Sequence, residues 1–342
     1  MNRPWLSIII PVYNPPLDLF QKCLESLQTI SIPMEVLLID DGSNTETQRF
    51  CETVVVSDNR IRCIHQENQG VSCARTNGIS EAKGKYIFFL DSDDAVSVDW
   101  CKYISENYDT LHGDWIIFDA IDYFPQKNKY VSRNIFQDGT SGVLSAKDTL
   151  HMMLSTNKLC ECWGKLISAE LLNKKKIEFP NGVAQGEDFI FNLKIVENAD
   201  KILAVNRAAY IYRYELKNTE RLLRNPSKYL SDLVAVCNEQ ELAIKVLSNA
   251  ENRDDHVFMF KQRTIDEIGS DIIKLMAANM WTEKPMKDIN TIITTYGLTN
   301  CGSVLKIRKL KTKIYYLALK YRMWFVIRLI SVVKAKKERS YR

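Results

Sequence analysis

The chain has 342 residues, of which 46% are hydrophobic and 26% are charged, so it can bury a sizeable core and is not a disordered protein. This length suits one large domain with an extension better than a short single module. The net charge is +4, but residues 306–342 alone carry 13 Lys or Arg against one acidic residue, which leaves the preceding residues at −8. The basic character therefore belongs to the C-terminal segment.

The first 120 residues alternate short β-branched runs with helix-like segments, the pattern of βαβ units around a mainly parallel sheet. Strands are expected at 6–10, 35–39, 61–64, 86–90 and 115–118. From residue 139 to about 214 the elements become shorter, and after Asn225-Pro226 the pattern is almost wholly helical. The sequence therefore predicts an α/β fold followed by a helical region.

Cysteine usage and the N-terminus indicate a cytoplasmic protein. The nine cysteines form no CxxC pair, are odd in number and fall mostly in apolar runs, which is typical of reduced thiols. Cys160 and Cys162 form the closest pair but lack the further ligands of a zinc site. The first residues lead straight into the strand at 6–10 without the apolar segment of a signal peptide, so export is not expected.

Two of the expected strands end in acidic turns. Ile39 leads into Asp40 and Asp41, and Leu90 leads into the sequence Asp91-Ser92-Asp93-Asp94. Ligands of open α/β sheets bind outside the carboxyl ends of the strands, and carboxylate oxygens suit Mg²⁺ or Mn²⁺ bridging a diphosphate. Taken alone, the second turn has an equally simple explanation as a solvated acidic turn or a helix N-cap.

A family resemblance chooses between these interpretations. Four segments occur in the order and approximate spacing of the family 2 glycosyltransferases of the GT-A fold, namely residues 7–14, 38–43, 68–79 and 89–94. The sequence resembles in particular the bacterial enzymes that assemble capsule, lipopolysaccharide and exopolysaccharide. The resemblance is strong over about residues 5–100 and weaker to about 215. It implies a catalytic domain at 1–215, and the helical pattern of the following residues predicts a helical extension at 216–342.

The resemblance also implies a donor site for a nucleoside-diphosphate sugar, with a UDP-sugar favoured. It places Pro11 and Tyr13 against the nucleotide base and Asp41 at the base or ribose, with Asp40 as the second carboxylate of the pair. A tyrosine ring can stack on a pyrimidine while a carboxylate accepts a hydrogen bond from its N–H. The alternative is structural, with Tyr13 packing and Asp40 capping the next helix.

The same resemblance assigns the diphosphate and metal contacts. Arg75 would lie near the donor diphosphate, Asp91 would reach the ribose or the donor sugar, and Asp93 would bind the divalent metal, Mn²⁺ or Mg²⁺. Asp94 would cap or orient its neighbours. An arginine near a helix start can equally form a surface ion pair.

The acceptor side is expected from the middle region. Residues 162–166 and 186–189 resemble the Trp-x-Lys-Leu and Glu-Asp blocks of the polysaccharide-assembling enzymes, although Gly164 replaces the family's Asn. Trp163 would offer a flat apolar face to an acceptor sugar, and Asp188 would be the general base, with Glu187 orienting it or capping the helix. A metal on one side and a base on the other imply inversion at the anomeric carbon.

The basic segment at 306–342 interleaves cations with aromatic residues and has an apolar stripe at helical spacing. Charges interrupt it well short of the roughly 20 apolar residues of a membrane span. An amphipathic helix on an anionic membrane surface and a helix packed on its own domain are both consistent with the pattern. No DNA- or RNA-binding motif accompanies the charge, so no nucleic-acid partner is expected.

The sequence thus predicts a glycosyltransferase that acts on a growing, lipid-linked bacterial surface glycan at the inner face of the cell membrane. A nucleotidyltransferase on a similar sheet is the main alternative, but it gives no reason for Asp188. A non-catalytic nucleotide-sugar-binding protein is the other alternative, and the presence of Asp93 and Asp188 argues against it.

Overall fold

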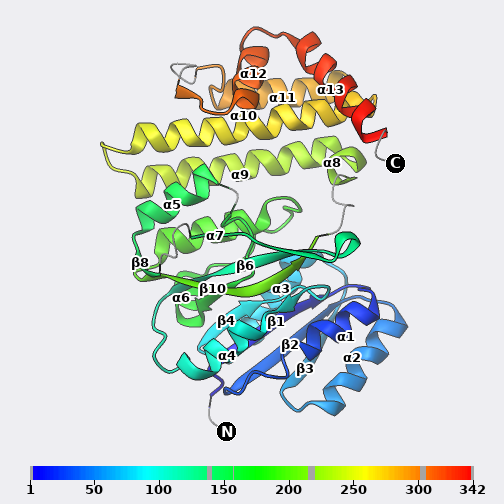
Figure 1. Ribbon diagram of the computed structural model, residues 1–342, viewed down its shortest axis with the longest axis vertical. Coiled ribbons are helices and arrows are strands. Elements are labelled where there is room, and N and C mark those ends of the chain that lie inside the picture. The colour runs from blue at the N-terminus through cyan, green and yellow to red at the C-terminus, as the bar shows by residue number, and fades with distance from the viewer. Residues whose placement is uncertain (1–2, 137–140, 157, 215–219, 301–305, 340–342) are drawn as a thin grey trace. The chain divides into compact units, whose positions relative to one another are not determined.

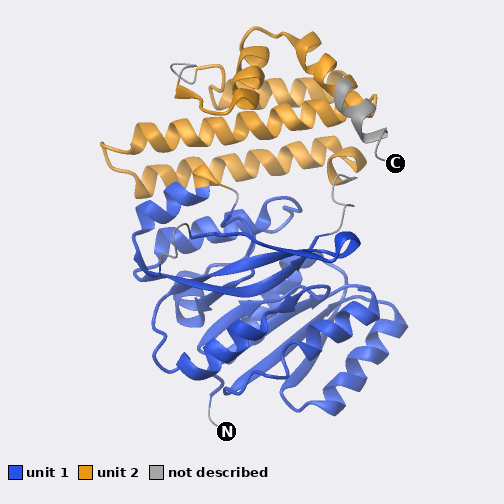
Figure 2. Cartoon of the chain, in the orientation of Figure 1, with its two compact units in different colours: residues 1–153, 157–215 blue, residues 154–156, 216–342 orange. Residues whose placement is uncertain are grey.

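The computed structural model describes residues 3–136, 141–156, 158–214, 220–300 and 306–339 (Figure 1). The chain forms two compact units (Figure 2). Unit 1 comprises residues 1–153 and 157–215 and is an α/β unit, whereas unit 2 comprises residues 154–156 and 216–342 and is helical. The catalytic, donor-binding, acceptor-binding and metal-binding residues expected from the sequence all belong to unit 1.

Half of the unit 1 sheet is parallel. Its strands β1 (Leu6–Val12), β2 (Met34–Asp41), β3 (Ile61–Gln66) and β4 (Tyr86–Phe89) lie in the order β3-β2-β1-β4. The apolar runs of β1, β2 and β4 are almost completely buried because the central strands of a parallel sheet are covered on both faces. Because β1 and β2 are parallel neighbours, their carboxyl ends meet at one edge of the sheet, as the sequence predicts.

The other half of the sheet is mixed. Strand β9 (Lys165–Ser168) lies antiparallel between β4 and β6 (Trp115–Phe124), and β10 (Ile202–Arg213) continues parallel to β6. The short strands β5 (Ala95–Val96), β7 (Lys129–Ser132) and β8 (Gly142–Leu144) complete it. β10 also pairs antiparallel with β5, the strand that follows the turn after β4, so it brings late residues of unit 1 next to that turn.

Among the described residues, seven helices belong wholly or mainly to unit 1. They are α1 (Leu17–Glu25), α2 (Thr45–Ser57), α3 (Val71–Glu81), α4 (Val98–Asn107), α5 (Ala146–Ser155), α6 (Ala169–Lys175) and α7 (Glu187–Asn198), with a 3₁₀ turn at Pro125–Lys127. Helix α3 packs unusually close to the sheet at Gly78, where a Cβ atom would lie 2.4 Å from a methyl carbon of Ile9. The glycine thus permits the contact that sets the position of α3 and of its side chains.

Unit 2 consists of α8 (Glu220–Arg224), α9 (Pro226–Leu247), α10 (Arg253–Ala277), α11 (Glu283–Thr295), α12 (Leu310–Lys320) and α13 (Trp324–Arg339). Helices α12 and α13 both contact α10. At Gly269 of α10 a Cβ atom would lie 2.2 Å from the Tyr315 ring, so α12 packs closely against a residue without a side chain.

The C-terminal segment differs from the single long helix that the sequence suggested. It breaks between α12 and α13, where Arg322 has a φ of +53°. Much of the apolar stripe faces inward, since Tyr316, Leu319 and Ile327 are buried. The alternative of a helix packed on its own domain therefore holds for this face of the segment. Residues 340–342, and the side chains from 333 onward, lie outside the described part.

Among the described residues no helix is both long and apolar enough to cross a membrane. The eight cysteines of the described residues form no disulfide. Cys301 lies outside the described residues.

Candidate active site

The turn after β2 holds the two carboxylates expected at the donor base. Asp41 accepts hydrogen bonds from Gln66 Nε2 and from the backbone N–H groups of Gln69 and Gly70, each at 2.8 Å. Gly70 is the residue before α3, so the start of that helix holds the Asp41 carboxylate in place. Asn77 Nδ2 in turn donates to Gln66 Oε1 at 2.8 Å. The orientation of Asp41 is therefore fixed before any ligand binds.

Asp40 points to different partners. Its carboxylate is fully buried and accepts from Ser43 N at 3.0 Å and Gln48 Nε2 at 3.3 Å, and it pairs with His65 Nδ1 at 2.7 Å. Ser43 Oγ also accepts from the Asn14 backbone N–H at 3.2 Å. These contacts connect the turn after β2 with the turn after β1. They show that Asp40 organises its own turn, and a direct contact from Asp40 to a donor stays a prediction.

Pro11 and Tyr13 lie at the carboxyl end of β1. Pro11 is half-buried within the strand, whereas the Tyr13 side chain is 58% exposed. Asn14 follows with a φ of +47°, a left-handed conformation that Asn tolerates better than most residues. An exposed ring on a fixed turn is available for stacking on a planar base.

The three carboxylates of the turn after β4 occupy different environments. Asp91 is partly exposed, Asp93 is exposed and Asp94 is buried. Asp94 accepts from Tyr210 Oη at 2.8 Å and from Arg213 N at 2.6 Å. Burial raises the pKa of Asp94 well above its usual range, and the charges of Asp91 and Asp93 raise it further. Asp94 thus anchors the turn, while Asp91 and Asp93 face outward.

Arg75 joins the acidic turn to the expected general base. Its Nη2 donates to Asp91 Oδ1 at 2.8 Å, and its Nη1 donates to Asp188 Oδ1 at 2.7 Å. The Arg75 side chain is 5% exposed and lies with its guanidinium carbon 5.5 Å from the Phe179 ring centre. Although burial disfavours the charged form, Asp188 and Asp91 hold the pKa of Arg75 well above its ordinary value.

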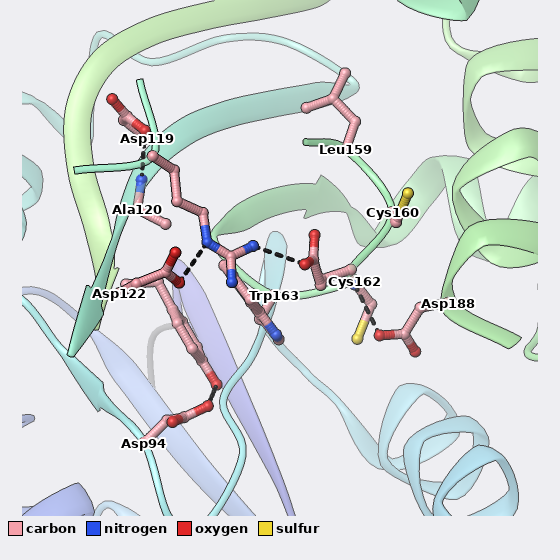
Figure 3. Close-up of polar contacts among 12 residues, drawn as sticks. Asp94, Asp119, Ala120, Asp122, Leu159, Cys160, Cys162, Trp163 and Asp188 are labelled. Carbon is pink, nitrogen blue, oxygen red and sulfur yellow. Dashed lines mark hydrogen bonds and ion pairs between the residues drawn. The ribbon is translucent and has the colours of Figure 1, made fainter. Parts of the chain in front are cut away.

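Asp188 lies in the first turn of α7, after Gly186, whose φ is +85°. Its second oxygen, Oδ2, accepts from the Cys162 backbone N–H at 3.1 Å (Figure 3). One turn later on the same helix, the fully buried Asn192 donates its Nδ2 to the carbonyl oxygens of Leu159, Cys160 and Glu161, at 2.9, 3.2 and 2.9 Å. Asn192 thereby fixes the loop that supplies the Cys162 N–H.

Glu187 begins α7 and is buried, with 8% exposed. This position allows either of the roles expected from the sequence, orientation of Asp188 or capping of α7. The supporting role of Glu187 stays a prediction.

Trp163 is less available than the sequence suggested. It is 4% exposed, because the Tyr210 ring stacks on it with centres 4.2 Å apart and the Arg133 guanidinium carbon lies 4.6 Å from its ring centre. The expected open indole face is therefore not present in this structure. Any acceptor contact from Trp163 is limited to the small part that remains accessible.

Three residues that shape the site are missing from the sequence prediction. Tyr210 of β10 donates to Asp94 and accepts from the Asp91 N–H at 3.1 Å, and Asn192 holds the loop before β9. Arg133 pairs with Asp122 Oδ1 at 2.7 Å and with Glu161 Oε1 at 2.6 Å. Tyr210 belongs to a run of alternating tyrosines, which indicates a strand but not its partner. Arg133 and Asn192 stand in no recognisable motif.

The outward carboxylates of Asp91 and Asp93 could hold a divalent metal together with a bound diphosphate. Within the described residues no group of three or more His, Cys, Asp or Glu could enclose an ion. Asp93 is exposed and Asp91 has one oxygen not occupied by Arg75, so the turn offers hard oxygen donors on an open surface. Mg²⁺ and similar ions bind at sites of one or two carboxylates plus substrate phosphates. The residues therefore fit a metal that is completed by a bound diphosphate.

Comparison with known proteins agrees with this geometry. The sequence profile described as Glycosyl transferase family 2 matches residues 7–174. The chain is 29% identical to the uncharacterized glycosyltransferase EpsJ of Bacillus subtilis, over 67% of this chain and 66% of EpsJ. It is 28% identical to the glycosyltransferase GlyA of Streptococcus pneumoniae, over 71% of this chain and 35% of GlyA. The chain thus spans less than two thirds of the length of each of these relatives.

Solved structures show the same fold. The crystal structure of S. aureus TarS 1-349 in complex with UDP-GlcNAc aligns with a TM-score of 0.69 and 18% sequence identity, over 93% of this chain and 91% of that one. Unit 1 is therefore a GT-A fold, and helices follow it toward the C-terminus, as predicted. Residues 7–174 therefore form a family 2 glycosyltransferase domain. The predicted family, fold class and enzyme class are confirmed.

Proposed function

We propose that this chain transfers a sugar from a nucleoside-diphosphate sugar to a hydroxyl of a bacterial surface glycan, with inversion at the anomeric carbon and with the help of a divalent metal. In this proposal residues 1–215 are the catalytic domain and residues 216–342 are the helical extension. The observation that carries the proposal is the Arg75 bridge, which brings Asp91 of the acidic turn and Asp188 of α7 into one constellation.

The bridge supports a transferase site because it assembles two functions that are far apart in the sequence. A single buried guanidinium contacts both carboxylates. Asp91 of the acidic turn and Asp188 therefore lie close to each other, on either side of the Arg75 guanidinium. Sugar transfer by direct displacement needs a leaving diphosphate on one side of the anomeric carbon and a base on the other. A nucleotidyltransferase would give no role to the carboxylate of Asp188.

The environment of Asp41 favours a UDP-sugar as the donor. A carboxylate has about four lone-pair positions. Gln66, Gln69 and Gly70 occupy three of them, two on Oδ1 and one on Oδ2. The remaining position on Oδ2 suits a base with a single ring N–H, such as uracil, better than guanine, which presents two neighbouring donors. Tyr13 and Pro11 would pack against the base, and the relative TarS was solved in complex with UDP-GlcNAc.

The metal would be held by Asp93, with Asp91 beside it. When bound, a divalent cation neutralises charge on the diphosphate and stabilises it as a leaving group. Arg75 contributes a second, fixed positive charge near Asp91, and the buried guanidinium cannot lose its proton. Asp94 and Tyr210 keep the turn in the conformation that presents Asp91 and Asp93.

Asp188 would act as the general base. Its carboxylate accepts the proton of the acceptor hydroxyl as the hydroxyl oxygen attacks the anomeric carbon and the bond to the diphosphate breaks. The Arg75 and Cys162 contacts occupy one position on each carboxylate oxygen, which orients the group and leaves further lone pairs for the acceptor. Attack from the side opposite the diphosphate gives inversion.

We further propose that the acceptor is lipid-linked and that unit 2 touches an anionic membrane surface. The side chains of Tyr321, Phe325 and Leu329 are each more than 60% exposed. Phe325 and Leu329 lie about one turn apart on α13, and Tyr321 lies in the break before that helix. Lys320, Arg322 and Arg328 are exposed nearby in the sequence, and residues 306–332 contain no acidic residue. Aromatic and apolar side chains next to cations suit the headgroup region of anionic lipid. This exposed face differs from the buried stripe.

A donor screen tests the core of the proposal. Thermal unfolding of the full chain is measured with a panel of UDP-, GDP- and dTDP-sugars, each with and without Mn²⁺. We expect stabilisation by a UDP-sugar that increases with Mn²⁺, since a ligand that binds the folded state raises the unfolding temperature. Stabilisation by GDP-sugars alone would contradict the base assignment, and equal stabilisation in the presence of a chelator would contradict the metal.

The membrane proposal needs a separate measurement. Vesicles with anionic lipid are sedimented with the wild type and with a Phe325→Ser, Leu329→Ser variant. A matched control changes two exposed apolar residues of another helix, Leu242→Ser and Val246→Ser in α9. We expect the first variant alone to lose binding, and equal binding by all three proteins would rule the surface out.

A further inference from the structure

A cluster of thiols and an ionisable pair lies beside the turn after β2, apart from the Asp91, Arg75 and Asp188 constellation. Cys63 and His65 are two residues apart on β3 and so point to the same face of the sheet. Cys63 Sγ lies 3.7 Å from His65 Nε2, and His65 Nδ1 lies 2.7 Å from Asp40 Oδ2. In the parallel ladder Asp40 is the direct partner of His65. Cys51 of α2 belongs to the buried core against which Cys63 packs, and each thiol shifts the pKa of the other.

This arrangement has the features of an activated nucleophile. A carboxylate orients one ring nitrogen of the imidazole, and the other nitrogen faces the thiol. The Asp40 carboxylate is fully buried, so its contact with His65 fixes the ring. The Cys51 thiol lowers the pKa of Cys63, and the nearby His65 lowers it further, although burial opposes both. The hydrogen bond to Asp40 raises the pKa of His65, which favours its protonated form.

The second thiol sets the kind of chemistry that the cluster can perform. Cys51 is completely buried, and its contact with Cys63 and its burial raise its pKa, so it stays protonated while Cys63 ionises. Cys63 is half-buried and accessible to a small reagent. A reactive thiolate with a protonated thiol in contact is the arrangement of a peroxide-sensitive pair with a resolving cysteine.

We propose that Cys63 and Cys51 form a hydroperoxide-sensitive thiol pair that controls the donor site through His65 and Asp40. The Cys63 thiolate attacks one oxygen of a hydroperoxide, the O–O bond breaks, and the leaving oxygen takes a proton from the His65 imidazolium. Cys63 becomes a sulfenic acid. The Cys51 sulfur then attacks the Cys63 sulfur, and the hydroxyl group leaves as water with the proton of Cys51. The two thiols are oxidised to one disulfide while the hydroperoxide is reduced to water and an alcohol or a second water.

The expected consequence for the donor site follows from the residues that Asp40 holds. A disulfide ties α2 to β3, and α2 also carries Gln48, which donates to Asp40. The same carboxylate accepts from Ser43, whose hydroxyl accepts from the backbone next to Tyr13. Oxidation therefore disturbs the turn that carries Asp41 and weakens donor binding. This consequence rests on the proposed function, whereas the thiol chemistry does not.

The thiol chemistry is tested by treating the full chain with hydrogen peroxide and mapping its peptides by mass spectrometry without reduction. Cys73 is also half-buried, lies on α3 and serves as the matched control through Cys73→Ser. We expect a Cys51–Cys63 disulfide in the wild type and in the Cys73→Ser variant, and a trapped sulfenic acid at Cys63 in the Cys51→Ser variant. His65→Gln should slow oxidation of Cys63 roughly tenfold, because less of the thiol is ionised. Oxidation of Cys73 as fast as Cys63, or no effect of His65→Gln, would overturn the proposal.

The regulatory part is tested by titrating reduced and oxidised protein with UDP and Mn²⁺. We expect weaker binding to the oxidised wild type, recovery after treatment with a dithiol, and no effect of peroxide on the Cys63→Ser variant. Equal binding by the reduced and disulfide-bonded wild type would overturn the regulation. If the reduced wild type binds no nucleotide, the proposed function fails, and the peptide map still decides whether Cys63 and Cys51 are a reactive pair.

Discussion

The Arg75 bridge gives the sharpest prediction about catalysis. Replacing Arg75 with Lys keeps a buried cation but removes the planar fork that reaches Asp91 and Asp188 at the same time. Within the described residues Arg75 Nε has no hydrogen-bond partner, so the hydrogen bonds that the substitution removes are those of the two Nη atoms. The lysine ammonium has one nitrogen in place of the two Nη atoms, so we expect one of the two carboxylate contacts to be lost.

The magnitude follows from that loss of one contact. A hydrogen bond to a charged group contributes about 1.5–3 kcal/mol. If the bridge positions the base against the leaving diphosphate, the same free energy is lost from the transition state, and kcat falls by roughly 10- to 100-fold. Donor affinity should change less than kcat, because Asp41, Tyr13 and Asp93 are untouched.

The assay is the Mn²⁺-dependent release of UDP from the UDP-sugar that stabilises the protein most, at saturating donor, with unfolding monitored in parallel. Arg207→Lys is the control, since Arg207 forms an exposed 3.5 Å ion pair with Asp99 and exposed pairs contribute little. A wild-type rate for a folded Arg75→Lys protein would refute the role of the bridge. So would an equal loss of activity in Arg207→Lys.

Three further changes probe other parts of the site. Asp93→Ala should weaken Mn²⁺-dependent UDP binding on the order of tenfold or more in calorimetric titration, and unchanged affinity would remove Asp93 from the metal site. Asn192→Leu leaves buried carbonyl oxygens without a hydrogen-bond donor, so we expect the free energy of unfolding to fall by about 1–3 kcal/mol and kcat to be lower. A variant with wild-type stability and activity would show that Asn192 does not hold the loop. His65 faces Asp40, Cys63 and Glu52, and its pKa is raised in the folded protein. The wild type should therefore be more stable than His65→Gln by the largest margin below pH 6.5, and this margin should be lost as the pH rises through the pKa of His65 in the folded state. Urea unfolding of both proteins between pH 5.5 and 8.5 checks this, and a difference that grows with pH would show that the sign is wrong.

The strands of unit 1 could be predicted because each is a short apolar run between turn residues. The acidic turns at Asp41 and Asp91 follow two such runs directly, so their place at the carboxyl edge of the sheet follows from local sequence. The antiparallel insertion of β9 between β4 and β6 has no comparable signal. It depends on pairing across the whole of unit 1, which periodicity does not reveal.

The site shows the same division. Arg75 was placed near the diphosphate by resemblance, but its fork to Asp188 joins residues 113 positions apart and could not be read from spacing. Tyr210 and Asn192 act through a hydroxyl and an amide whose partners depend on how β10 and α7 pack. Trp163 looked like an open platform because sequence alone cannot show that Tyr210 and Arg133 cover it.

The sequence predicts the C-terminal segment as one helix because its apolar residues keep helical spacing throughout. The helix breaks at Arg322, where the sequence has no Pro or Gly that would predict a break. The close packing of Tyr315 at Gly269 and the burial of its neighbours show that residues of α12 belong to the core of unit 2. Removing them would therefore destabilise unit 2, and substitutions at exposed positions are the better test of membrane binding.

The most direct test of the proposed mechanism compares binding and transfer in Asp188→Asn. Asparagine keeps the size of the side chain but cannot accept a proton as a base, so we expect UDP binding with Mn²⁺ to stay within a few-fold of wild type while sugar transfer to a lipid extract falls on the order of 100-fold or more. Transfer at the wild-type rate, at saturating donor and acceptor, would show that Asp188 is not the base and that the constellation joined by Arg75 serves another purpose.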